Sequence, residues 1–196
     1  RALSEAGLKA SDHKVRRVDT QAPEMAGTFI GQQIYRGYFE TGDPFQFLDL
    51  YDALTEISAL RGEKSLWPQC DHAVVQAMRR ARPDVLFVAS WRPAEDISSS
   101  MLRWRNLGTE RLPKATVPGL PSGFGLEDSH RTRWIAGHYA MLRDIFAGDP
   151  RFLELDMGAA DAPSRLAAHI GRDMPWWGRE NVNTAGAPLT AEDTAV

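Results

Sequence analysis

The segment from Asp84 to Trp104 (DVLFVASWRPAEDISSSMLRW) constrains the fold more than any other part of the chain. Its apolar run, Val85 to Ala89, lacks the alternation of a half-exposed strand, so it predicts a central strand of a parallel sheet with both faces covered. Pro93 follows shortly and suits the first turn of a helix, and the acidic pair Glu95 and Asp96 suits the positive end of the helix dipole. The segment therefore predicts a strand, a tight turn and a helix.

The turn in this segment is a candidate phosphate site. Ligands of open α/β sheets bind beyond the carboxyl ends of the strands, which is where Arg92 lies. Ser100 comes eight residues later, or about two helical turns, so its side chain can return toward the turn. A guanidinium and a hydroxyl that converge match a phosphate group. Two alternatives stay open: Arg92 can form a surface ion pair, and the serines can be a solvated helix face.

Length and composition limit the class of protein. With 196 residues, 43% of them hydrophobic, the chain predicts one α/β domain over residues 1–183 and a disordered tail over residues 184–196. The net charge of −3 argues against nucleic acid or a membrane surface as partner. No apolar run is long enough to span a bilayer. The single cysteine, Cys70, excludes an intramolecular disulfide and a cysteine zinc cluster, and favours a cytoplasmic location.

The other expected elements alternate between strand and helix, which indicates a mostly parallel sheet with right-handed crossovers. The Gly- and Pro-rich residues 105–125 are expected to be a lid or insertion loop over an acceptor site. Gly31 and Gly37 suggest close packing of the helix that contains them. The expected strands are Lys9–Val18, Tyr51–Ile57 and Phe152–Asp156; the expected helices are Arg1–Leu8, Thr28–Thr41, Pro68–Arg82, Leu126–Phe146 and Ala162–Ile170.

Ionisable side chains gather at the end of the expected strand Lys9–Val18. Among them, His13 is a candidate base and Lys14 a candidate positive group, since such a density is common at functional sites. A solvated edge strand explains the same pattern equally well. Cys70 and His72 are one cysteine and one histidine with no further candidate ligand beside them. Such residues are more typically packing and capping residues than metal ligands or nucleophiles.

Arg92, Asp96 and Ser100, spaced R-x-x-x-D-x-x-x-S at a strand-to-helix turn, resemble the 3′-phosphate-binding segment of sulfotransferases that use 3′-phosphoadenosine 5′-phosphosulfate (PAPS). The family usually has its proline two residues after the arginine, whereas Pro93 follows Arg92 directly. The segment RALSEAGL resembles the helix after the family's phosphate-binding loop, yet the chain contains no G-x-x-x-x-G-K-[ST] run. The resemblance thus leaves two alternatives open: this loop precedes Arg1, or the protein has lost it.

The fold that this resemblance implies is a three-layer α/β/α domain of the P-loop nucleotide-binding type that lacks its first strand. PAPS would be the co-substrate, without a metal, and the acceptor a small-molecule or carbohydrate hydroxyl or amine. Nucleic acid and membrane are not expected as partners, and the oligomeric state stays open. Two alternatives also stay open: a nucleotide-dependent kinase on a similar sheet, and a non-catalytic binding module without the phosphate loop.

The resemblance also implies roles for individual residues. Arg92 and Ser100 would hold the 3′-phosphate. Arg179, after an aromatic pair, would reach a phosphate, and the alternative for this segment is that it covers the end of the sheet. Glu56, near a strand end, would be the general base that takes the acceptor proton. Asp52, on the same expected strand, is the second candidate for that role, and His13 is a further one. Pairing of Glu56 with a nearby arginine is an equally good explanation of its position.

Overall fold

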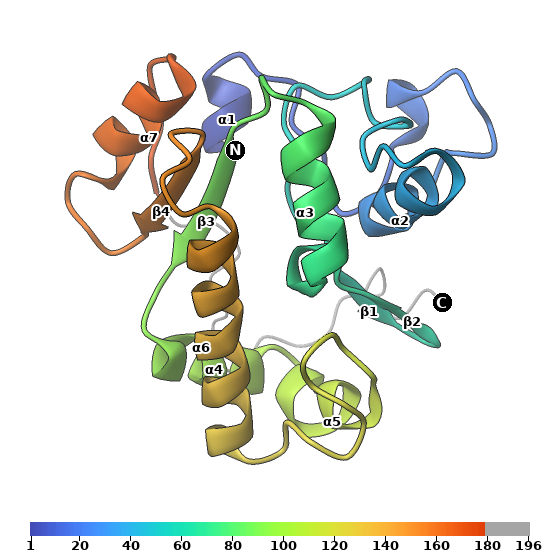
Figure 1. Cartoon of the computed structure of the whole chain (residues 1–196), viewed down its shortest axis with the longest axis vertical. Helices are drawn as coiled ribbons and strands as arrows, with labels where there is room; N and C mark the ends of the chain where they lie inside the picture. The colour runs from blue at the N-terminus through green and yellow to red at the C-terminus, as the bar shows by residue number, and fades with distance from the viewer. Residues whose placement is uncertain (179–196) are drawn as a thin grey trace.

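The computed structural model describes residues 1–178 of the chain, and Figure 1 shows a mixed α/β protein. Its described helices and strands follow in chain order. The helices are α1 (Ala2–Glu5), α2 (Ile30–Thr41), α3 (His72–Ala81), α4 (Ala94–Arg103), α5 (Leu112–Lys114), α6 (Asp128–Ile145) and α7 (Ala162–Ile170); the strands are β1 (Ala59–Arg61), β2 (Lys64–Leu66), β3 (Phe87–Trp91) and β4 (Phe152–Asp156).

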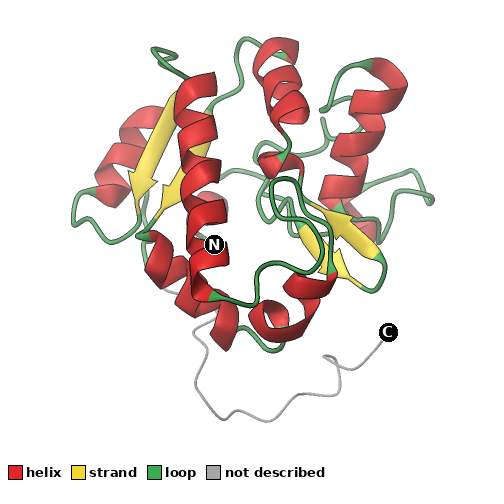
Figure 2. Ribbon diagram, turned by 60° about the horizontal axis from the view of Figure 1, so that its bottom comes forward, coloured by secondary structure: helices red, strands yellow, loops and turns green. Residues whose placement is uncertain are grey.

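The strands form two separate pairs. β3 and β4 run parallel, in a register from Phe87 opposite Phe152 to Trp91 opposite Asp156. β1 and β2 form an antiparallel hairpin. Figure 2 shows the parallel pair and the hairpin on opposite sides of the molecule, with helices around them. The predicted mostly parallel sheet is therefore represented, within residues 1–178, by one parallel pair.

Helices cover the parallel pair unequally. On one face, Ala89 of β3 is buried with Ile135 and Tyr139 of α6. On the other face, α7 packs its Leu166 against Leu155 of β4. The side chain of Val88 in β3 also points to this second face and is 44% exposed. The prediction that both faces of this strand are covered is therefore wrong for β3, because α7 reaches only its neighbour.

The expected strands Lys9–Val18 and Tyr51–Ile57 do not form; a single parallel bridge joins Ala10 and Ala53. Side-chain hydroxyls take the place of the backbone ladder here. The Ser11 hydroxyl accepts a hydrogen bond from the Thr55 backbone N–H at 2.9 Å, and the Thr55 hydroxyl donates to the Ser11 carbonyl at 2.6 Å. Serine and threonine side chains compete in this way with regular secondary structure.

The close packing predicted for the glycines of α2 is confirmed. A Cβ at Gly31 would overlap the carbonyl oxygen of Ile57, and one at Gly37 would overlap that of Asp43. The helix ends at Gly42, whose left-handed conformation (φ 81°) is a common helix stop. Ile30 and Ile34, both fully buried, join α2 to a core shared with α3.

The segment 105–125 differs from the loop that was predicted. A π-helical turn, η3 (Leu107–Arg111), leads directly into α5, and Leu112 is fully buried. Val117 and Leu120 are buried with it against Trp67. The segment is thus a packed part of the protein, because its sparse apolar residues face the same core.

The C-terminal elements agree with the prediction. β4 has the expected bounds, and α7 ends at Gly171, which adopts the left-handed conformation (φ 65°). The expected tail, residues 184–196, lies outside the described residues. Within residues 1–178, no helix combines the length and the apolar character that crossing a bilayer requires.

Candidate functional site

Arg92 and Ser100 line the same pocket. Arg92 comes directly after β3, at the carboxyl end of the parallel pair, and Ser100 lies on α4. The pocket has a volume of about 280 Å³. The residues around it are Arg92, Ile97, Ser100, Met101, Trp104 and Leu107. An arginine, a serine and a tryptophan therefore line one space, and the other lining residues are apolar.

The guanidinium of Arg92 is exposed and forms no ion pair with a carboxylate of residues 1–178. The surface ion pair that was the alternative explanation of this residue is thus absent from the described part of the chain. Trp104 is 41% exposed, so part of its ring is open to a ligand. An unpaired guanidinium beside an aromatic ring suits a molecule with a phosphate and a planar base.

A buried polar network holds α4 in place. Arg131 of α6 is 1% exposed and donates from Nε to the hydroxyl of Ser98 at 2.8 Å. The Ser98 hydroxyl, fully buried, donates in turn to the carboxylate of Asp128 at 2.5 Å. Arg131 also donates to the carbonyl oxygens of Gly125 and Leu126. The network joins α4 to the first turn of α6 and so fixes the helix that carries Ser100.

The side chains of His13 and Glu56 lie close together in a second cluster, which also contains Asp12. One oxygen or nitrogen of each of these three side chains lies within 4.8 Å of the others. Asp12 Oδ1 lies 2.8 Å from Nδ1 of His13, so the carboxylate orients the imidazole. Partial burial alone would raise the pKa of Asp12, but hydrogen bonds from His13 and its charge outweigh burial and lower that pKa.

Two further features distinguish this cluster. Glu56 has a left-handed backbone (φ 51°), which costs a residue with a Cβ of the order of 1 kcal/mol. The ammonium groups of Lys14 and Lys64 lie 5.0 and 5.5 Å from the ring centre of Phe29. The His13 and Phe29 ring centres are 6.1 Å apart. A base and two positive charges thus surround one aromatic ring.

The remaining predicted residues take no part in these groups. Arg179 lies outside the described residues. The carboxylate of Asp52 accepts a hydrogen bond from the backbone N–H of Lys9 at 2.8 Å, so Asp52 has a structural role. Within residues 1–178, no hydrogen bond or ion pair joins the Arg92 pocket to the His13 cluster.

Sequence reasoning missed two parts of the surface. Asp12 was not singled out, although an acidic residue beside a candidate histidine base is a usable signal. A larger groove between α3, α6 and residues 118–124 was also missed, because its lining comes from three distant segments. Comparisons with protein-family models, curated proteins and solved structures find no match for this chain.

Proposed function

We propose that this protein is a sulfotransferase that moves a sulfuryl group from PAPS to a hydroxyl or amine of a small-molecule or carbohydrate acceptor. One observation carries the proposal: Arg92 and Ser100 line the same pocket at the carboxyl end of a parallel strand. The R-x-x-x-D-x-x-x-S spacing supports it, because these are the two positions that would hold the 3′-phosphate. A three-layer α/β/α fold of the P-loop type is part of the same proposal.

The pocket offers a distinct contact for each end of the nucleotide. The Arg92 guanidinium supplies a bidentate donor for the 3′-phosphate, and the Ser100 hydroxyl supplies a third hydrogen bond. Trp104 offers a face on which the adenine can stack. The Arg131 network keeps α4 in position before the nucleotide binds, which reduces the entropy lost on binding.

The His13 cluster supplies the chemistry that transfer requires. His13 or Glu56 takes the proton of the acceptor as a new bond forms between the acceptor oxygen or nitrogen and sulfur. At the same time, the bond from sulfur to the bridging phosphate oxygen breaks, and 3′,5′-adenosine bisphosphate (PAP) leaves with the electron pair. The charges of Lys14 and Lys64 stabilise the sulfuryl oxygens in the transition state.

The test is a calorimetric titration of the chain with PAP, with ADP, which lacks the 3′-phosphate, and with ATP. We expect PAP to bind most tightly. Arg92→Met should weaken PAP binding by roughly 10- to 100-fold, since a hydrogen bond to a charged group contributes about 1.5–3 kcal/mol. The same change should leave the affinity for ADP almost unaltered.

Arg80→Met is the matched control, because Arg80 is an exposed arginine in the last turn of α3. It should bind PAP like the wild type. Equal affinities of Arg92→Met and wild type for PAP would refute the proposal, and preference for ATP over PAP would favour a kinase. Glu56→Gln and His13→Gln should both bind PAP normally. The variant that removes the general base should lose turnover with PAPS.

A further inference from the structure

The His13 cluster brings together three side chains of the kinds that bind transition metals. A ring nitrogen of His13 and one carboxylate oxygen each of Asp12 and Glu56 lie within 4.8 Å of one another. Within residues 1–178, no other group of three such side chains comes this close. In a tetrahedral zinc site with bonds of about 2.0–2.1 Å, the ligand atoms are about 3.3 Å apart. Side-chain rotations that move an atom by roughly 1.5 Å or less would therefore place all three around one ion.

Backbone contacts fix the two segments that carry these side chains. Ser11 directly precedes Asp12, Thr55 directly precedes Glu56, and the two segments are joined here by hydrogen bonds of 2.9 and 2.6 Å. The carbonyl of His13 accepts a hydrogen bond at 3.0 Å from the backbone N–H of the first residue of α2. The ligand positions are thus set before an ion arrives, which lowers the entropy lost on binding.

All three side chains can be reached from solvent. The side chains of Asp12 and His13 are 54% and 43% exposed, and Glu56 is exposed as well. Within residues 1–178, the Glu56 carboxylate forms no ion pair, so the pairing with an arginine that was the alternative explanation of this residue is absent there. Two carboxylates this close repel each other, and a cation between them removes the repulsion.

The positive side chains nearby leave these carboxylates available. The two lysine ammonium groups over the Phe29 ring form no ion pair with the cluster in the described part of the chain. Arg16 contributes to the lowered pKa of Asp12, but its guanidinium is ion-paired with Asp19 at 2.7 Å. The cluster therefore keeps two carboxylates whose combined charge matches that of a divalent cation.

We propose that Asp12, His13 and Glu56 bind a divalent transition-metal ion of the Zn²⁺ class, with a fourth position open to water. One imidazole and two carboxylates suit Zn²⁺ better than Mg²⁺, which prefers oxygen ligands in an octahedron. The ion occupies the lone pairs that would otherwise take the acceptor proton, so the proposed sulfuryl transfer belongs to the metal-free protein. Binding of the ion itself does not depend on that function.

The test is a calorimetric titration of the full chain with Zn²⁺, and with Mg²⁺ as the comparison ion. We expect one Zn²⁺ per chain and Mg²⁺ binding that is at least about 10-fold weaker. Glu56→Gln and His13→Gln should each weaken Zn²⁺ binding by at least about 10-fold, since removal of even a residue that orients a ligand has such an effect. Glu56→Gly also removes the carboxylate, and glycine favours the left-handed backbone found here, so misfolding would not explain a loss in this variant.

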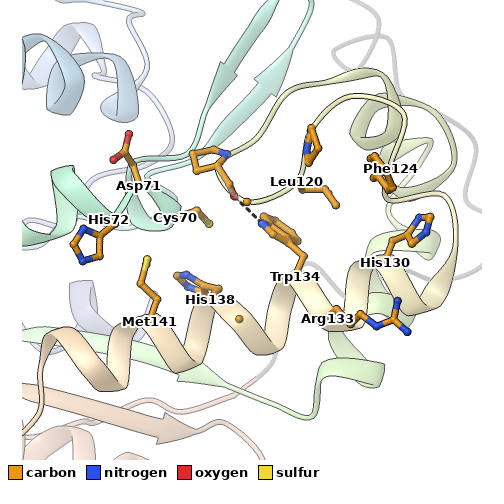
Figure 3. A pocket seen from close by; sticks show the side chains of 14 residues that line it. Cys70, Asp71, His72, Leu120, Phe124, His130, Arg133, Trp134, His138 and Met141 are labelled. Atoms are coloured by element: carbon orange, nitrogen blue, oxygen red, sulfur yellow. Dashed lines mark hydrogen bonds between the residues drawn. The ribbon is translucent and has the colours of Figure 1, made fainter.

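His72→Gln is the matched control, because His72 follows Asp71 as His13 follows Asp12. Figure 3 shows the side chains of Asp71 and His72 pointing in different directions, and within residues 1–178 no third ligand joins them in a group. Glu63→Gln, in the turn between β1 and β2, controls for the loss of an exposed carboxylate. Both variants should bind Zn²⁺ within about twofold of the wild type, because neither residue belongs to the cluster.

Three results would overturn the proposal. They are no binding of Zn²⁺ to the wild type, wild-type affinity in Glu56→Gly, and equal losses in His72→Gln and His13→Gln. Arg92→Met should bind Zn²⁺ like the wild type, and the PAP titrations contain no metal. Failure of this site and failure of the proposed function are therefore distinguishable.

Discussion

Replacement of Arg131 by methionine should be among the most destabilising single changes in this chain. The guanidinium is 1% exposed and makes hydrogen bonds to Ser98, to the Gly125 and Leu126 carbonyls and to Asp128. Without it, the buried Gly125 carbonyl loses its partner, at a cost of about 1–3 kcal/mol, and the bond to Ser98 adds about 1 kcal/mol. Asp128 is 63% exposed and stays hydrated, so its charge adds little. We therefore expect a loss of roughly 3 kcal/mol.

Arg143→Met is the matched control on the same helix. Arg143 makes two hydrogen bonds to Glu154, at 2.8 and 2.6 Å, but its side chain is 53% exposed. Exposed ion pairs contribute less than about 1 kcal/mol. Urea unfolding followed by circular dichroism would measure both variants, with similar m-values showing that the unfolded states are comparable. Equal losses in the two variants would refute the inference that burial makes the hydrogen bonds of Arg131 the more costly ones to lose.

Three further outcomes are expected. Gly137→Ala should stabilise the protein by about 0.5–1 kcal/mol in urea unfolding, since the helix gains propensity and nothing clashes. Hydrogen bonds from Arg151 and Arg79 hold the pKa of Asp149 well below its usual range. Asp149→Asn should therefore destabilise at pH 7, and its difference from wild type should shrink below about pH 4, where the unfolded carboxyl is protonated. Burial raises the pKa of Cys70 to about 12, so iodoacetamide at pH 8 should label the folded thiol roughly a thousandfold more slowly than the thiol in urea.

Local sequence signals predicted the elements whose boundaries depend on single residues. Gly171 and Gly42 stop their helices in the left-handed conformation, as their positions suggested. Signals that depend on distant neighbours were less informative. The apolar run before Ser90 correctly indicated a strand but wrongly predicted that a helix would cover Val88. Nothing in Tyr51–Ile57 revealed that the hydroxyl of Ser11 would replace its ladder.

The residues of the candidate site were likewise predictable only where their relation is local in the sequence. The spacing of Arg92 and Ser100 was enough to predict that they face one space, because α4 begins two residues after Arg92 and its geometry is fixed from there to Ser100. The distance between His13 and Glu56 depends on how two irregular segments pack, so no period in the sequence encodes it. The groove between α3, α6 and residues 118–124 could not be predicted from the sequence for the same reason.

Some locally unfavourable features of this chain have a packing explanation and others do not. Gly31 and Gly37 are explained by packing, since any side chain there would overlap a neighbouring carbonyl. The left-handed backbone of Glu56 has no such explanation within residues 1–178, and Glu56 lies in the cluster that we propose to take the acceptor proton. Because a folded chain often retains such costs where function requires them, Glu56 is a place where substitutions should separate stability from function.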